Sequence, residues 1–222
     1  MQNVKCEMRN ERQNPQSAIR NPQSGLRPVI GLLGGVGAGK SFVAAQFTKL
    51  GCQGVDADRL GHELLREPKI RQAIRERFGE GVCGPDGEVD RRRLGELVFA
   101  HSDTLKALDA ILDPELWRRV REAVEEARRS DAAAVVLDAA LILEKGLDKL
   151  CTVMVYIEAP EEVRRVRAAE ARGWDPSEVI RREALQFSLK AKQDCADYIV
   201  DNSTSPELTF EQVRMILSRL VR

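Results

Sequence analysis

Short apolar runs alternate with longer amphipathic stretches along most of the chain. The short runs are nearly continuous in apolar residues, as expected for strands buried inside a sheet. The longer stretches carry apolar residues at helical spacing and are bounded by glycine or proline. Strands that alternate with helices favour a parallel sheet covered by helices on both faces. We therefore expect an α/β fold with five buried strands, at residues 28–34, 52–58, 132–141, 152–160 and 197–202.

The helical segments between the second and third strands make up an unusually long stretch. Residues 60–130 are too long for one crossover connection, so we expect them to form a helical side domain. The core then consists of residues 29–59 and 131–222. Pro114 should begin a new helix, because proline is favoured in a first turn. The expected helices span residues 41–51, 60–78 with a break near Pro68, 91–100, 103–112, 114–129, 161–173, 175–196 and 205–221.

The beginning of the chain differs from the rest. Residues 1–28 are polar and have neither a helical nor a strand period. They also lack the apolar segment of a secretory signal peptide. We expect a disordered tail. A mitochondrial transit peptide and a true translation start near Val29 are the two alternatives. N-terminal sequencing of the native protein tests the second, which a native N-terminus at Met1 would dismiss.

Composition and charge limit the classes of binding partner and the cellular compartment that we expect. The 222 residues are 43% hydrophobic and 32% charged, as in globular proteins. The chain has 35 basic residues (lysine and arginine) and 35 acidic residues (aspartate and glutamate), so its formal net charge is zero. This net charge does not favour broad binding to nucleic acids or membranes. The five cysteines lack metal-site spacing and favour a reducing, cytoplasmic setting. No apolar run reaches the roughly 18–20 residues of a membrane span. We expect neither a nucleic-acid nor a membrane partner.

Five glycines fall within residues 31–41, between the first strand and the first helix. Gly34, Gly39, Lys40 and Ser41 match the pattern G-x-x-x-x-G-K-[ST] of a P-loop. Such a loop holds phosphates with backbone N–H groups, and glycine permits both the turn and the close approach. The helix that follows directs its positive end at the anion. The expected nucleotide-binding residues are Gly34, Gly35, Val36, Gly37, Ala38, Gly39, Lys40, Ser41 and Phe42.

Three classes of protein bind nucleotides in this way: small-molecule kinases, GTPase switches, and ATPase motors or binding modules. The guanine-reading pattern N-K-x-D does not occur in the sequence. The segment at residues 58–61, DRLG, matches D-x-x-G, but this short pattern follows the second strand, where it suits a kinase better. A motor ATPase usually needs a larger chain or partner domains. The kinase class is therefore favoured.

A kinase needs a carboxylate that accepts the proton of the attacking hydroxyl. Asp56 and Asp58 come at the end of the second strand, at the sheet edge where ligands bind. Residues two apart in a strand share a face, so both side chains could point into one cleft. The alternative for Asp58 is a helix N-cap. Asp138 at the end of the third strand either lies near the magnesium water or starts a turn.

Kinases also need cations that stabilise charge on the transferred phosphoryl group. Arg164, Arg165, Arg167 and Arg172 lie close together in the segment VRRVRAAEARG. The alternative is a charged helix face in contact with water. A break after Gly173 would suit a lid that closes over the substrate.

Several segments together resemble the dephospho-coenzyme A kinase family. Besides the P-loop, they are VDADRLGH, GPDGEVDRRRLGELVFAHSDTLKALDAILDP, LDAALILEKGLDKLCTVMVYIEAP and RREALQFSLKAKQDCADYIVDN. The resemblance runs from about Val29 to Val221. It implies a three-layer P-loop kinase domain over residues 29–222, with a helical substrate-binding insert at about 60–130 and a lid at about 164–190. It also implies transfer of the γ-phosphate of ATP to the ribose 3′-hydroxyl of dephospho-coenzyme A, the last step of coenzyme A synthesis.

The resemblance assigns roles to matching positions. It implies that Asp58 is the general base and that Asp56 supports this base or the metal ion. Lys40 bridges the phosphates of ATP, and Ser41 holds Mg²⁺. No role as a catalyst is implied for His62, for which a structural role is expected.

The remaining positions belong to the lid and its surroundings. Arg167 and Arg172 match the lid arginines, and Asn202 lies in the loop that the family places near adenine. ATP and Mg²⁺ are the implied cofactors and dephospho-coenzyme A is the implied partner. We expect a monomer or a weak homo-oligomer. The runner-up is another P-loop kinase that acts on a nucleotide or nucleoside.

This chain departs from the pattern of the family at four places. Phe42 replaces a common threonine, and Asp113 precedes Pro114 where the family has histidine. Ala140 replaces a proline, and Arg164 replaces a glutamine. Arg167 and Arg172 are also one residue further apart than expected. These changes concern acceptor binding and the lid more than the P-loop.

Overall fold

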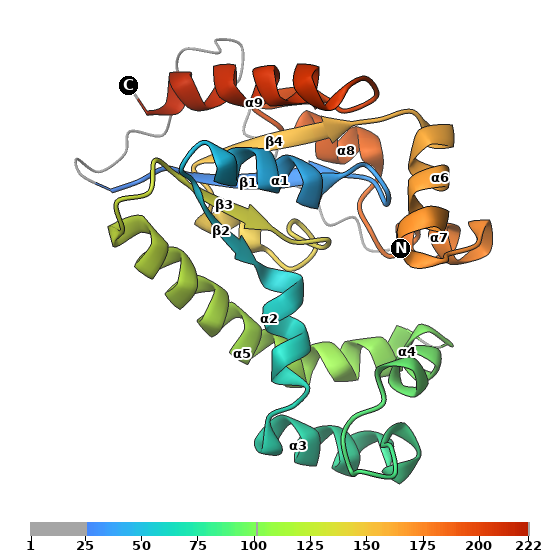
Figure 1. The fold of residues 1–222 in the computed structure, drawn as a ribbon. Helices are drawn as coiled ribbons and strands as arrows, with labels where there is room; N and C mark the ends of the chain where they lie inside the picture. The colour runs from blue at the N-terminus through green and yellow to red at the C-terminus, as the bar shows by residue number, and fades with distance from the viewer. Residues whose placement is uncertain (1–25, 101, 222) are drawn as a thin grey trace.

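Five parallel strands form one sheet in the order β2-β3-β1-β4-β5 (Figure 1). The computed structural model describes residues 26–100 and 102–221, so the expected tail lies almost wholly outside the described residues. The predicted α/β fold with a five-stranded parallel sheet is confirmed. The strands are β1 (Val29–Gly34), β2 (Gln53–Asp56), β3 (Val135–Asp138), β4 (Val153–Glu158) and β5 (Tyr198–Asp201).

Helices cover both faces of this sheet (Figure 1). On one face, α1 (Lys40–Lys49) and α9 (Pro206–Leu220) pack on an apolar cluster that includes Phe47 and Val213. On the other face, the second half of α5 (Ser102–Arg129) packs on a cluster that includes Val120 and Leu137. The central strand β1 is buried along its whole length, so its carboxyl end and the loop that follows rest on a rigid support.

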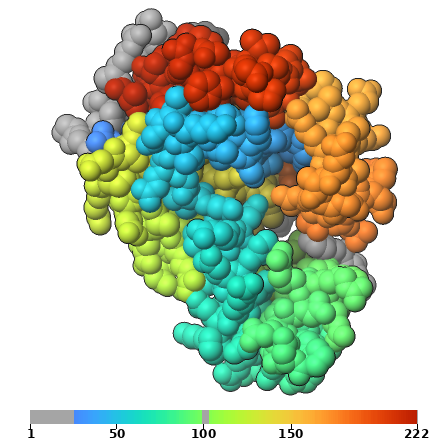
Figure 2. Space-filling model, in the orientation of Figure 1, coloured from blue at the N-terminus to red at the C-terminus, as the bar shows by residue number. Residues whose placement is uncertain are grey.

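A helical insert extends from the core between β2 and β3 (Figures 1 and 2). It has an apolar cluster of its own, in which Ile70, Ile74 and Leu94 are buried. This cluster gives the insert a separate small core beside the sheet. The elements of the insert are α2 (Ala57–Leu64), α3 (Pro68–Phe78), the short 3₁₀ helix η1 (Glu80–Val82), α4 (Arg91–Ala100) and the first half of α5.

The expected break at Pro114 is wrong, because α5 runs through this residue as one helix of 28 residues. Proline removes one backbone hydrogen bond from a helix, but tertiary packing can outweigh this loss. Here Leu108 packs in the cluster of the insert and Val124 in the cluster of the sheet. Nowhere in residues 26–100 or 102–221 is there a helix long and apolar enough to cross a membrane.

The single helix expected at residues 175–196 is also wrong. The chain instead forms α7 (Pro176–Glu183) and α8 (Leu189–Asp194), after α6 (Glu161–Arg172). Ser188 caps α8 by accepting a hydrogen bond from the Ala191 N–H at 3.1 Å. The Phe187 N–H donates to Glu144, which follows β3 and precedes the short 3₁₀ helix η2 (Leu147–Leu150). These two interactions favour a turn over another helical segment.

Candidate nucleotide-binding and catalytic site

The P-loop connects the end of β1 at Gly34 to the start of α1 at Lys40. Gly37 and Gly39 have φ angles of 74° and 91°, which other residues rarely adopt. A Cβ atom on Gly37 would lie 2.1 Å from the Arg164 carbonyl oxygen. Both the turn and the close approach of α6 therefore require glycine. The first N–H groups of α1 lack partners within the helix and face the loop, which suits an anion.

Lys40 folds back over the loop. Its Nζ atom donates to the carbonyl oxygens of Gly34 and Gly35, at 3.4 and 3.3 Å. Desolvation lowers the pKa of Lys40, and the carboxylates of Asp138 and Asp58 act against this shift. The ammonium group thus lies between the phosphate-binding backbone and two carboxylates.

Asp138 is the partner of Ser41. The Ser41 hydroxyl donates to Asp138 Oδ2 at 2.7 Å, across 97 residues of sequence. Asp138 ends β3 and is the register partner of Asp56 on β2. Desolvation raises the pKa of Asp138, while the Ser41 hydroxyl and Lys40 oppose this shift. Asp138 thus lies beside the P-loop serine, and its expected position near the magnesium water stays a prediction.

The predicted arrangement of Asp56 and Asp58 on one strand face is wrong. Strand β2 ends at Asp56, and Asp58 lies in the first turn of α2. Asp56, rather than Asp58, caps this helix, since its Oδ1 atom accepts from the Arg59 N–H at 2.8 Å. Sequence spacing alone did not separate the two residues, because the helix begins at the residue directly after the strand.

Asp58 is held by the chain that follows β3. Both of its carboxylate oxygens lie 3.3 Å from the Ala140 N–H, which donates to them. One side of Asp58 is open to solvent, as an incoming hydroxyl requires. Desolvation by the surrounding protein still raises the pKa of Asp58, opposed by the Ala140 N–H, while the charge of Asp56 raises it further. The carboxylate is therefore a stronger base than an ordinary aspartate.

The chemistry of these side chains fits Mg²⁺. Ser41, Asp138 and Asp56 offer hydroxyl and carboxylate oxygens, the ligands that Mg²⁺ prefers. Within the part of the chain that the structure describes, no three acidic, histidine or cysteine side chains form a metal cage by themselves. In sites of phosphoryl transfer, Mg²⁺ usually takes one or two protein ligands and completes its shell with phosphates and water. The arrangement thus suits an ion that arrives with a nucleotide.

Helix α6 brings the expected lid arginines to the loop. Arg167 approaches Gly39, and its Nη1 atom is buried with no hydrogen-bond partner among the described residues. Arg172 lies over the Trp174 ring, 4.8 Å from its centre, and its charge acts on Lys40 and His62. Both arginines thus lie near the P-loop. By contrast, Arg165 pairs with Glu161 on the exposed face of α6.

Asn202 supports the P-loop from behind. Its side chain is buried and donates to the Ala38 carbonyl oxygen at 2.8 Å. It also accepts from the Thr209 hydroxyl at 3.2 Å. The expected position of Asn202 near adenine stays a prediction, and its amide group donates to the backbone of the P-loop. Asn202 is therefore a positioning residue.

Lys192 and Glu144 were missed by reasoning from the sequence. Lys192 is only 2% exposed and donates to Gln186 Oε1 at 2.6 Å. Glu144 lies 3.7 Å away, and Lys192 acts electrostatically on Lys40. No local signal distinguishes this buried lysine from the exposed Lys190, because α8 is short and both residues lie in a polar segment.

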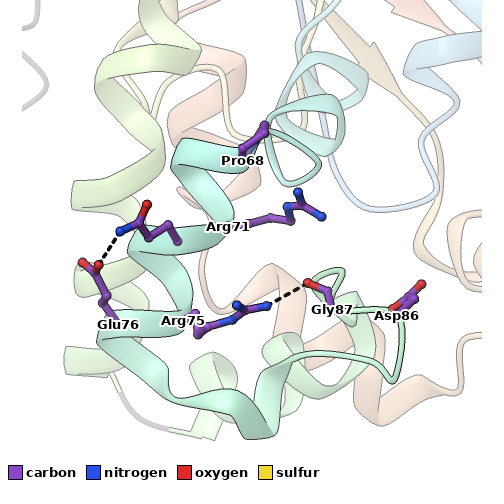
Figure 3. Close-up of a pocket in the computed structure, with 7 residues that line it drawn as sticks. Pro68, Arg71, Arg75, Glu76, Asp86 and Gly87 are labelled. Carbon is purple, nitrogen blue, oxygen red and sulfur yellow. Dashed lines mark hydrogen bonds between the residues drawn. The ribbon is translucent and has the colours of Figure 1, made fainter.

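A concavity lies in the insert, with a volume of about 560 Å³ (Figure 3). Its lining includes Arg71, Arg75 and Asp86. Arg71 pairs with Glu88, while Arg75 pairs with Glu80 and donates to the Gly87 carbonyl oxygen. Because these cations already have partners and none of the P-loop residues line the concavity, we place the chemistry at the P-loop.

Comparison with known proteins agrees with this geometry. The model of the dephospho-CoA kinase family matches residues 28–207. A dephospho-CoA kinase of Carboxydothermus hydrogenoformans is 34% identical over 194 residues, which cover 86% of this chain and 94% of the relative. The crystal structure of TT1252 from Thermus thermophilus is 32% identical, with a TM-score of 0.76, and 88% and 99% of the two chains are covered.

The fold is shared more widely. A dephospho-CoA kinase from Campylobacter jejuni superposes with a TM-score of 0.60 at 19% identity, over 87% of this chain and 97% of the other. This likeness concerns the fold alone. The family model and the relative from Carboxydothermus hydrogenoformans, which is matched over 94% of its length, show that this chain belongs to the dephospho-CoA kinase family.

Proposed function

We propose that this protein transfers the γ-phosphate of ATP to the ribose 3′-hydroxyl of dephospho-coenzyme A. The products are coenzyme A and ADP, and the reaction is the last step of coenzyme A synthesis. Membership of the family supports the reaction. The single structural observation that carries the proposal is the meeting of Lys40, Ser41 and Asp58 at one end of the sheet.

The P-loop supplies the binding of the phosphates. Backbone N–H groups at the start of α1 and the ammonium of Lys40 stabilise the negative charge of the triphosphate. Lys40 exchanges its bonds to the Gly34 and Gly35 carbonyl oxygens for bonds to phosphate oxygens. Phosphoryl transfer depends mainly on such positioning and charge stabilisation.

Asp58 accepts the proton of the attacking hydroxyl. Desolvation raises the pKa of Asp58, which brings its basicity closer to that of an effective general base. The Ala140 N–H fixes the orientation of the carboxylate. The proposed transfer is direct: the hydroxyl oxygen bonds to the terminal phosphorus in line with the bond to ADP, which breaks.

The residues that would hold Mg²⁺ are Ser41 and Asp138, with Asp56 close by in the neighbouring strand. A bound Mg²⁺ would supply positive charge there to neutralise the charge that develops on the phosphates during transfer. This assignment moves the main acidic partner from Asp56 to Asp138. Asp56 retains its role as the cap of α2.

Helix α6 closes the site. Arg167 and Arg172 stabilise the charge of the transferring group from the side opposite the sheet. Closure of α6 and α7 also excludes water, which otherwise competes with the ribose hydroxyl for the phosphoryl group.

The test is an assay of ADP release with ATP and Mg²⁺ and four separate acceptors: dephospho-coenzyme A, adenosine, AMP and CMP. The proposal predicts efficient release only with dephospho-coenzyme A. Efficient release with a different acceptor would leave the protein a kinase but overturn the acceptor. No acceptor-dependent release would overturn the proposed activity.

A further inference from the structure

His62 and Arg91 form a pair at the edge of the site. The Arg91 Nη2 atom lies 2.7 Å from His62 Nε2. His62 belongs to α2, and Arg91 is the first residue of α4, so the contact joins two helices of the insert. Both side chains are exposed, and a substrate can therefore reach them.

His62 lies on the same helix as the site residue Asp58. Asp58 and His62 are four residues apart in one helix, so they share a face about one turn apart. The charges of Asp58, Asp56 and Arg172 all act on His62. Arg91 contacts His62 from α4, a different helix of the insert.

The positive charge of Arg91 is available for a ligand. Its neighbours Arg92 and Arg93 pair with Glu96 and Asp90. Among the described residues Arg91 has no carboxylate partner and contacts the imidazole of His62 instead. A guanidinium group only donates hydrogen bonds, so Nε2 of His62 accepts here and the imidazole is neutral. His62 thus orients Arg91 without cancelling its charge.

We propose that Arg91, oriented by His62, binds the 5′-diphosphate of the acceptor substrate and so helps to select dephospho-coenzyme A over adenosine. This inference rests on the proposed function. A ribose whose 3′-hydroxyl lies at Asp58 carries its 5′-phosphate on the far side of the sugar ring. One helical turn of about 5.4 Å along α2 separates Asp58 from His62, the residue that Arg91 contacts, so a diphosphate that extends from the ribose can reach Arg91. A guanidinium group also matches the paired oxygens of phosphate.

The test compares Arg91→Gln with the wild-type enzyme. We expect the KM and the calorimetric Kd for dephospho-coenzyme A to rise about 10- to 100-fold, as the loss of a charge-assisted hydrogen bond allows. The KM for ATP should stay within about two-fold, because Arg91 belongs to the acceptor side. Arg92→Gln is the matched control, since Arg92 pairs with Glu96 on the same helix, and it should leave both constants unchanged.

Variants of His62 test the orienting role. His62→Ala should raise the KM for dephospho-coenzyme A, whereas His62→Gln, whose carbonyl oxygen can still accept from Arg91, should restore part of the affinity. Arg91→Lys should fall between the wild type and Arg91→Gln, since it retains the charge but not the paired donors.

Two outcomes would overturn the inference: an unchanged KM and Kd for dephospho-coenzyme A in Arg91→Gln, or an equal rise of the KM for ATP. A failure of the proposed function would be distinct, because the wild-type enzyme itself would then not phosphorylate dephospho-coenzyme A.

Discussion

Asp58 combines a raised pKa with exposure to solvent. The Ala140 N–H holds the carboxylate in place, while solvent reaches its other side. Burial is the main cause of its raised pKa, the charge of Asp56 adds to the shift, and Lys40 opposes it. The same carboxylate is therefore both fixed in space and able to take a proton, as general base catalysis requires.

Replacement of Asp58 by asparagine tests this role. Asparagine keeps the shape and can still accept from the Ala140 N–H, but it cannot accept a proton. We expect kcat to fall by about 10²- to 10⁴-fold, with the Kd for ATP nearly unchanged. Steady-state turnover assays and calorimetric titration with ATP measure the two quantities. Near-normal turnover would show that Asp58 is only structural.

The pH dependence of the reaction reports the same group. Since the base acts only when ionised and its pKa is raised, activity should disappear as the pH falls through a value above the ordinary aspartate pKa of about 3.9. The measurement is kcat/KM for dephospho-coenzyme A at saturating ATP and Mg²⁺. The pKa of Asp138 is raised in the same cluster, so the profile gives an apparent value for the coupled group. A constant rate down to about pH 4 would contradict the assignment.

Residues whose role follows from a local pattern could be predicted from the sequence. The P-loop is such a case, because Gly37, Gly39 and Lys40 are needed at fixed spacing by the geometry of one loop. Asp138 and Lys192 depend on contacts across long sequence separations, with Ser41 and Glu144 respectively. No spacing in the sequence encodes those contacts, so the first remained one of two alternatives and the second was missed.

At the scale of elements, Arg164 connects α6, α7 and the P-loop. Its side chain is buried, donates to the Val36 carbonyl oxygen at 3.1 Å and pairs with Glu183 of α7. Its Nε atom is buried and lacks a hydrogen-bond partner within the described residues. Glu183 is therefore the main group that stabilises the positive charge of Arg164, which burial has desolvated.

This arrangement predicts unequal effects for the two partners. Glu183→Gln should lower the free energy of unfolding by about 1–3 kcal/mol, because it leaves the Arg164 charge buried without a carboxylate. Arg164→Gln should cost about 1 kcal/mol or less, since glutamine can still donate to Val36 and Glu183 is partly exposed. Urea unfolding measures both values.

Arg165→Gln is the control for this comparison. Arg165 is the exposed neighbour of Arg164 and pairs with Glu161, so its replacement should change stability by less than about 0.5 kcal/mol. If Arg164→Gln were as costly as Glu183→Gln or costlier, the buried charge of Arg164 would not be the reason why Glu183 matters for stability.

Most elements followed from the sequence, and the exceptions share one cause. Strands such as β1 and β4 were predicted because continuous apolar runs at this spacing are buried in parallel sheets. The positions at which helices are interrupted were not predicted correctly. Pro114 lies inside a helix that two apolar clusters hold on either side, and the turn at residues 184–188 depends on Glu144 from a distant segment. In both cases tertiary contacts override local preference.

At the scale of the whole molecule, the site lies where three parts of the chain meet. The sheet core provides the P-loop, the insert provides Asp58 and the proposed His62–Arg91 pair, and α6 provides Arg167 and Arg172. The insert and the α6–α7 segment flank the carboxyl end of the sheet, the edge at which α/β proteins bind ligands. A donor at the P-loop and an acceptor along α2 would thus meet at Asp58.

The most direct test of this account is the identity of the product. Wild-type protein and Asp58→Asn should be incubated with ATP, Mg²⁺ and dephospho-coenzyme A, and the products analysed by mass spectrometry and ³¹P NMR. The account predicts that the wild-type product is heavier by one phosphate and shows a new ribose 3′-phosphomonoester signal, while the variant forms this product far more slowly. Release of inorganic phosphate alone, or a phosphate at another position of the acceptor, would contradict it.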